Sequence, residues 1–150
     1  MRLELRVLPA GPTLTDMEAN IWFFIGMMEG LVSSGSDLTK IPFEQLKKDF
    51  YRVAKAGLES RFHDPLQGKE CDLQEWILSE GMQLAGNGLN TLKVKDTERY
   101  LEMIRSRVKR RQNGAVWQLK HFEKYHSIKK LVKEYMNNFE HNIPVHEWRL

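Results

Sequence analysis

The stretch RLELRVLPAGPT, residues 2–13, followed by the apolar run TDMEANIWFFIGMMEGL, residues 15–31, decides how this chain is interpreted. Charged and apolar residues alternate at the start of the first stretch, which predicts a half-buried β-strand. The charged face of that strand carries Arg2, Glu4 and Arg6. A carboxylate beside guanidinium groups suits a face that binds a metal ion, a phosphate or a substrate carboxylate. A cross-strand ion pair on a solvent-facing sheet is the alternative explanation.

Composition describes an ordinary globular protein. The chain has 150 residues, of which 41% are hydrophobic and 29% charged, and this is enough for one domain with its own core. Its single cysteine, Cys71, excludes an internal disulfide framework and favours a reducing compartment. The longest apolar run, residues 21–28, is much shorter than the roughly 20 residues of a membrane span. We therefore expect a soluble, cytoplasmic protein without a membrane partner.

The remainder of the chain has helical periodicity. We expect a mainly α fold, in which the N-terminal β-strand is followed by a bundle of five to six helices within a single helical domain over residues 1–150. Residues 62–71 are expected to form a loop, because they contain His63-Asp64-Pro65 and Gly68. Thr13, Thr15 or Asp16 can cap the first helix, and the later helix starts are expected at or near Pro42, Asp72, Asp96, Asn113 and Ser127.

Glycines and apolar residues give further expectations for the packing of these helices. Gly26 and Gly30 lie four residues apart in the first helix and would let another backbone approach closely. Gly86 and Gly88 are expected to end the third helix. The apolar face of the second helix is expected to be buried; it comprises Phe43, Leu46, Phe50, Val53, Ala54, Gly57 and Leu58.

Charge is distributed unevenly along the chain. Residues 1–98 carry 11 Lys/Arg and 15 Asp/Glu, whereas residues 99–150 carry 12 and 5. A basic helix over residues 99–111 could contact phosphates, so a helical interaction or nucleic-acid-binding module is the alternative function. We favour a solvated helix face, because that segment has no interleaved aromatic residues of the kind that stack on bases. The five histidines lack metal-ligand spacing, and no histidine near Cys71 indicates a catalytic thiol.

Several segments, taken in order, resemble one family. The chain is similar to the C-terminal portion of carboxylate-amine ligases related to type 2 glutamate–cysteine ligase, within the glutamine-synthetase-like superfamily. The resemblance rests on the RLELRVLPAGPT strand and turn, on Asp16, Ala19 and Asn20, on Gly57-Leu58, on RYLEMIRSRV at 99–108, on NGAVWQ at 113–118 and on PVHEW at 144–148. Their order and spacing, rather than any single motif, carry the resemblance.

The resemblance implies an ATP-dependent ligase that forms an amide from a carboxylate and an amine through an acyl phosphate. ATP and magnesium are the implied cofactors, provided that the rest of the site is supplied. In this family a Glu-x-Arg strand lines the active site, so Glu4 is implied as a magnesium ligand. Arg6 is implied as a catalytic residue that binds the substrate carboxylate or the transferring phosphoryl group. Asn20 is expected to support the strand rather than to touch substrate.

This chain would supply only part of such an enzyme. Members of the family are much longer, and most of their sheet and of their metal and nucleotide residues lie upstream of the Glu-x-Arg strand. We therefore expect a C-terminal fragment or subunit that is inactive alone. Its expected partner is an upstream sheet-containing ligase region, or a second copy joined through the N-terminal strand. A degenerate helical remnant without function is the remaining alternative.

Overall fold

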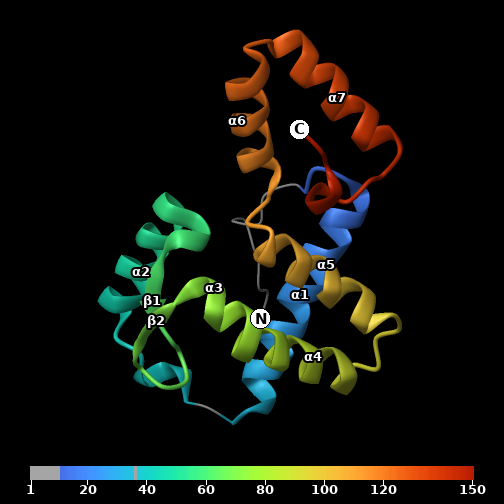
Figure 1. The fold of residues 1–150 in the computed structure, drawn as a ribbon. Coiled ribbons are helices and arrows are strands. Elements are labelled where there is room, and N and C mark those ends of the chain that lie inside the picture. The colour runs from blue at the N-terminus through green and yellow to red at the C-terminus, as the bar shows by residue number, and fades with distance from the viewer. Residues whose placement is uncertain (1–10, 36) are drawn as a thin grey trace.

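The computed structural model describes residues 11–35 and 37–150, which are mainly helical as expected. The predicted N-terminal strand, with Glu4 and Arg6, lies outside the described residues. Three helices pack together at the centre of the molecule: α1 (Leu14–Ser33), α4 (Met82–Thr91) and α5 (Thr97–Lys109) (Figure 1). The other α-helices are α2 (Phe43–Ala56), α3 (Leu73–Trp76), α6 (Gly114–Tyr125) and α7 (Ile128–Glu140).

Short turns connect these helices. Three are 3₁₀ turns: η1 (Leu38–Lys40), η2 (Gly57–Glu59) and η4 (Val145–Glu147). A π-helical turn, η3 (Ile77–Gly81), joins α3 to α4. Over the described ranges, 11–35 and 37–150, no helix is long and apolar enough to cross a membrane.

Three of the predicted capping residues begin their helices with a side-chain hydrogen bond. The side chains of Asp72, Asn113 and Ser127 accept hydrogen bonds from backbone N–H groups three residues later, which satisfies donors that the first helical turn leaves unpaired. These contacts confirm the predicted starts of α3, α6 and α7.

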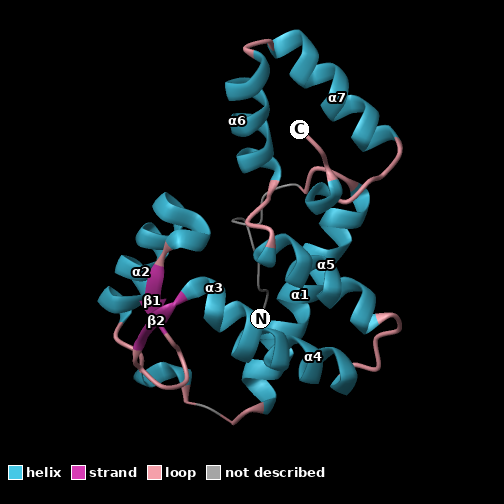
Figure 2. Ribbon diagram, in the orientation of Figure 1, coloured by secondary structure: helices cyan, strands magenta, loops and turns pink. Residues whose placement is uncertain are grey.

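The expected loop over residues 62–71 is wrong, because this segment contains an antiparallel hairpin of β1 (Arg61–His63) and β2 (Glu70–Asp72) (Figure 2). The hairpin turns at Asp64, whose carboxylate accepts hydrogen bonds from the amides of Leu66 and Gln67. Each strand has only three residues, which is too short to give a visible alternation in the sequence.

The close approach predicted at Gly26 and Gly30 is confirmed. Both glycines lie in α1 against α4, and Gly88 of α4 faces them from the other side. A Cβ at Gly88 would overlap the carbonyl oxygen of Gly26 and lie 2.7 Å from the nitrogen of Gly30. The expected helix end at Gly86 and Gly88 is therefore wrong: the helix continues to Thr91, because Gly88 serves a backbone contact inside α4.

A compact apolar core surrounds this contact. Side chains of α1, α4 and α5 form it, namely Ala19, Met82, Ala85, Leu89, Leu101, Ile104 and Val108. A second, smaller cluster joins α6 to the C-terminal segment and consists of Trp117, Val145 and Trp148, with Leu131, Tyr135 and Ile143 packed around it.

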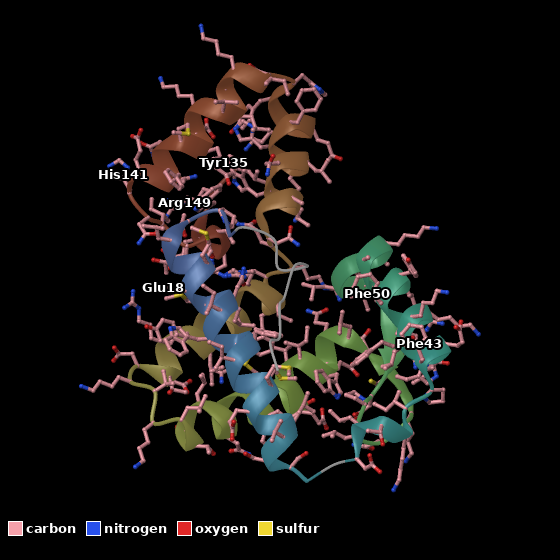
Figure 3. The ribbon with its side chains drawn as sticks, turned by 180° about the vertical axis from the view of Figure 1, so that it is seen from behind. Glu18, Phe43, Phe50, Tyr135, His141 and Arg149 are labelled. Atoms are coloured by element: carbon pink, nitrogen blue, oxygen red, sulfur yellow. The ribbon has the colours of Figure 1, made fainter. Side chains whose placement is uncertain are left out.

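The expected burial of the apolar face of α2 is wrong. Phe43 is 73% exposed and Phe50 is 52% exposed, and both lie on the same side of the helix (Figure 3). The opposite, polar side of α2 contacts the hairpin instead: the buried carboxylate of Asp49 accepts hydrogen bonds from the backbone N–H of His63 and from Gln45 Nε2. The helix is therefore attached through polar contacts, and its apolar face is left uncovered.

We predict that Gly88→Ala destabilises the fold strongly, because the added methyl group meets backbone atoms that cannot yield. Overpacking of this kind costs about 1–3 kcal/mol or more. Gly86→Ala is the matched control, since its Cβ would meet only the Cδ1 atom of Leu101 at 3.5 Å. That control should raise the free energy of unfolding by up to about 1 kcal/mol, as alanine does in a helix. Urea denaturation measures both; equal effects of the two substitutions would contradict the α1–α4 packing described here.

Candidate functional site

The site is built around the N-terminus of α1. Thr13 caps this helix: its Oγ1 accepts a hydrogen bond from the backbone N–H of Asp16 at 3.2 Å and donates one to Asp16 Oδ2 at 2.8 Å. Asp16 is fully buried. A buried carboxylate is costly unless charged and polar partners surround it, and here they come from segments distant in the sequence.

The charged partner of Asp16 is Arg107 in α5. Its Nη2 atom lies 2.9 Å from Asp16 Oδ1, and its Nη1 atom donates to Asn20 Oδ1 at 2.5 Å. The Arg107 side chain is 13% exposed, and burial lowers the pKa of its guanidinium while Asp16 opposes that shift. Its Nε atom is buried without a hydrogen-bond partner. The ion pair therefore joins α1 to α5, and Asn20 of α1 adds a second contact to the same guanidinium.

The C-terminal segment closes the same region. The backbone N–H of Val145 donates to Asp16 Oδ2 at 3.1 Å, and Arg110 donates to the carbonyl of His146 at 2.8 Å. Gln112 Nε2 donates to the carbonyls of Val145 and Trp148. Trp148 is buried and so docks this segment onto the body of the protein. Asp16 thus contacts two segments that lie about 90 and 130 residues further along the chain.

A pocket of about 250 Å³ opens beside this network. Its walls come from the first described residues, from α1, α5, α6 and α7, and from the C-terminal segment; they include Gly11, Pro12, Asn20, Arg107, Asn113, Gly114, Ala115, Gln118, Tyr135 and Val145. The polar groups here are amides, a phenol and a guanidinium whose charge Asp16 balances. This set suits positioning of a polar group better than capture of a free anion.

The described residues do not complete a catalytic centre. Within residues 11–35 and 37–150, no group of three His, Cys, Asp or Glu side chains could hold a metal ion. The Cys71 thiol, in β2, has a raised pKa because of burial, which disfavours the reactive thiolate. Glu4 and Arg6, the predicted metal ligand and catalytic residue, lie outside the described residues. Asn20 lines the pocket and binds Arg107, a contact the sequence did not indicate.

The basic helix behaves differently from a phosphate-binding patch. Arg105 pairs with Glu98 and Glu102, and Arg107 is held by Asp16. Arg110 is hydrogen-bonded to the C-terminal segment, and Arg111 pairs with Glu59. Four guanidinium groups of this segment thus form ion pairs or hydrogen bonds with other groups of the same chain.

A larger pocket, of about 720 Å³, lies between η1, α2 and the hairpin. His63 lines it, and His63 Nδ1 lies 3.1 Å from Asp49 Oδ2 and 2.7 Å from Gln45 Nε2. The Asp49 carboxyl has a lowered pKa, because hydrogen bonds from Gln45 and His63 outweigh its desolvation. Among the described residues that line this pocket there is no serine, threonine or cysteine, so none of them offers the His63–Asp49 pair a hydroxyl or thiol to activate. Its evident role is to attach the hairpin to α2.

Comparison with known proteins gives no relative from which a function could be transferred. No family model, curated protein or solved structure matches the chain.

We predict that Asp16→Asn lowers the free energy of unfolding by about 3–5 kcal/mol, because it leaves the Arg107 guanidinium buried without a counter-charge. The matched control is Glu102→Gln, which neutralises the surface partner of Arg105. Exposed ion pairs contribute about 0–1 kcal/mol. Chemical denaturation of both variants tests this; a loss for Asp16→Asn no larger than that of the control would refute the structural role of the pair.

Proposed function

We propose that the chain is the C-terminal helical part of an ATP-dependent carboxylate-amine ligase of the glutamate–cysteine type, working as a fragment or subunit that is inactive alone. Its role in this proposal is to hold the Glu4–Arg6 segment against a nucleotide-binding and metal-binding sheet that an upstream polypeptide supplies. The single observation that carries the proposal is the convergence of the resembling segments on one site.

Apart from Gly57-Leu58, which lies in η2, the described parts of these segments meet around Asp16 although they are far apart in the sequence. Arg107, from RYLEMIRSRV, pairs with Asp16, and Val145, from PVHEW, donates its backbone N–H to the same carboxylate. Asn113 and Gly114, from NGAVWQ, line the 250 Å³ pocket together with the Gly11–Pro12 turn. Residues that build one site are expected to be found together in related proteins, even when they are far apart in the sequence. Their contacts in this chain therefore support the resemblance.

Helix α2 supports the proposed dependence on a partner. Its exposed apolar stripe includes Phe43, Leu46 and Phe50, which recur at helical spacing on one face. Apolar side chains in such a row are usually covered in a complete protein. An upstream sheet-containing ligase region would cover them in this proposal.

Glu4 and Arg6 are the residues that would reach the reaction. In this proposal Glu4 is a magnesium ligand, and Arg6 binds the substrate carboxylate or the transferring phosphoryl group. Among the described residues no group of His, Cys, Asp or Glu side chains could hold a metal ion, so in this proposal the upstream region would hold most of the magnesium ligands and the ATP that the magnesium accompanies.

The nucleic-acid alternative receives less support. Phosphate binding needs free guanidinium or ammonium groups, whereas Arg105, Arg107, Arg110 and Arg111 are engaged within the chain. The basic helix therefore has a structural role that accounts for most of its charge.

The proposal predicts that the purified chain releases no ADP from ATP in the presence of glutamate and cysteine, because one segment supplies at most two active-site groups. Adding the polypeptide encoded upstream should restore amino-acid-dependent ADP release in a coupled assay. In the restored complex Glu4→Gln and Arg6→Lys should each lower the turnover by at least about tenfold.

Glu18→Gln is the matched control, since Glu18 is exposed on α1 and should leave turnover unchanged (Figure 3). Activity of the chain alone, or full activity of the complex with both Glu4→Gln and Arg6→Lys, would contradict the proposal. Salt-sensitive binding of generic RNA or DNA by the chain would favour the alternative instead.

A further inference from the structure

Helix α7 also leaves an apolar stripe uncovered, at the opposite end of the molecule from the hairpin (Figure 1). Leu131 and Tyr135 face inward and pack on the Trp117 cluster. The adjacent stripe runs the length of the helix with 42–61% of each side chain exposed; it consists of Ile128, Val132, Met136 and Phe139. Spacings of four, four and three residues place these side chains in one row.

A groove runs beside the stripe, between α6 and α7. It has a volume of about 270 Å³ and is lined by Gln118, Leu131, Val132, Tyr135 and Met136. Gln118 lies one helical turn before Phe122, an exposed aromatic side chain of α6. Val132 and Met136 belong both to the stripe and to the groove, so the exposed apolar surface is concave there, which suits the insertion of a side chain from a partner.

Along one edge of the stripe, positive charges lie toward the N-terminus of α7 and a negative charge lies at its C-terminus. Lys129 and Lys133 lie near the N-terminal half of α7, and Glu140 lies at its C-terminal end. Lys129 and Glu140 are eleven residues apart, which is three helical turns, so they lie on the same edge. Among the residues that the structure describes, neither of these two makes an ion pair within the chain. A helix with this polarity complements an antiparallel copy of itself.

We propose that α7 is a self-association surface on which a second copy of this chain docks, with the two α7 helices antiparallel about a two-fold axis between Val132 and Met136. This symmetry places Ile128 opposite Phe139 of the second copy, and Val132 opposite Met136 of the second copy. Lys129 of each copy then faces Glu140 of the other copy, so the two-fold axis gives two such ion pairs per dimer. Methionine is flexible enough to fill the groove.

Other occupants fit the surface less well. An anionic membrane would attract the lysines, but it would be repelled by Glu140 and could not fill a concave groove. An unrelated acidic helix would leave Glu140 facing like charge. The contact also differs from self-association through the N-terminal strand, because it involves none of residues 1–10.

Charge reversal tests this arrangement directly. Sedimentation equilibrium of the whole chain over a concentration series measures the dimer dissociation constant. Lys129→Glu or Glu140→Lys should each raise that constant by about tenfold or more, because two like charges then face each other twice per dimer. The double variant K129E/E140K should return to within about threefold of the parent, since it restores both pairs with reversed sign.

Two further variants separate this surface from the alternatives. Lys120→Glu makes the same charge change on the exposed face of α6 away from the groove and should leave the dissociation constant unchanged. Val132→Lys places a charge within the exposed stripe and should abolish the dimer while the circular dichroism spectrum stays the same. A parent chain that remains monomeric, a dimer that persists in Val132→Lys, or failure of the double variant to recover would each overturn the proposal. Binding to anionic vesicles that all four α7 variants retain would also overturn it.

Discussion

The ion pair between Asp16 and Arg107 is the contact on which the rest of the site depends. A buried carboxylate and a buried guanidinium each carry a large desolvation cost, which is offset only when both are surrounded by partners. Here Thr13, Asn20 and the backbone of Val145 supply those partners. Arg107 lies in α5, whereas these partners lie at the start of α1 and in the C-terminal segment. The pair therefore requires all three parts of the chain to assemble together. The pocket at Gly11–Pro12 is a consequence of that assembly.

The chain is well packed at its centre and uncovered at two of its helices. Glycines let α1 and α4 approach closely, and the core beside them contains side chains from three helices. In contrast, α2 and α7 each pack one side against the rest of the chain and expose an apolar stripe on another. Uncovered stripes of this length indicate contact surfaces. In the two proposals the stripe of α2 contacts an upstream ligase region and that of α7 contacts a second copy, so each can be tested without the other.

Local signals in the sequence predicted the helices well. Capping residues such as Asp72, Asn113 and Ser127 act on the nearest turn, and their effect does not depend on the rest of the fold. Gly26 and Gly30 were identified as a close contact because their spacing places both on one helix face. Burial was harder to predict. The periodicity of α2 shows that it has an apolar face, but the polar contacts of Asp49 with the hairpin decide that this face points outward.

Long-range polar contacts had no local signal at all. Arg107 belongs to a basic run that suggests a solvated surface, and only the tertiary structure brings it to Asp16, 91 residues away. The three-residue strands of the hairpin were likewise too short to show an alternating pattern. The resemblance grouped Asp16, Asn20 and the segments containing Arg107 and Val145, although the contacts among them could not be read from their spacing.

Native-state hydrogen exchange at the amide of Val145 tests the central claim most directly, because this N–H donates to Asp16 in the folded chain. If the Asp16–Arg107 pair holds the C-terminal segment, Asp16→Asn will accelerate exchange at Val145 by about a hundredfold, which corresponds to about 2.7 kcal/mol. Amides of the β1–β2 hairpin, which makes none of these contacts, serve as the reference and will change less than that of Val145. Unchanged exchange at Val145 in the Asp16→Asn chain would show that the C-terminal segment is held by other contacts and would contradict the account.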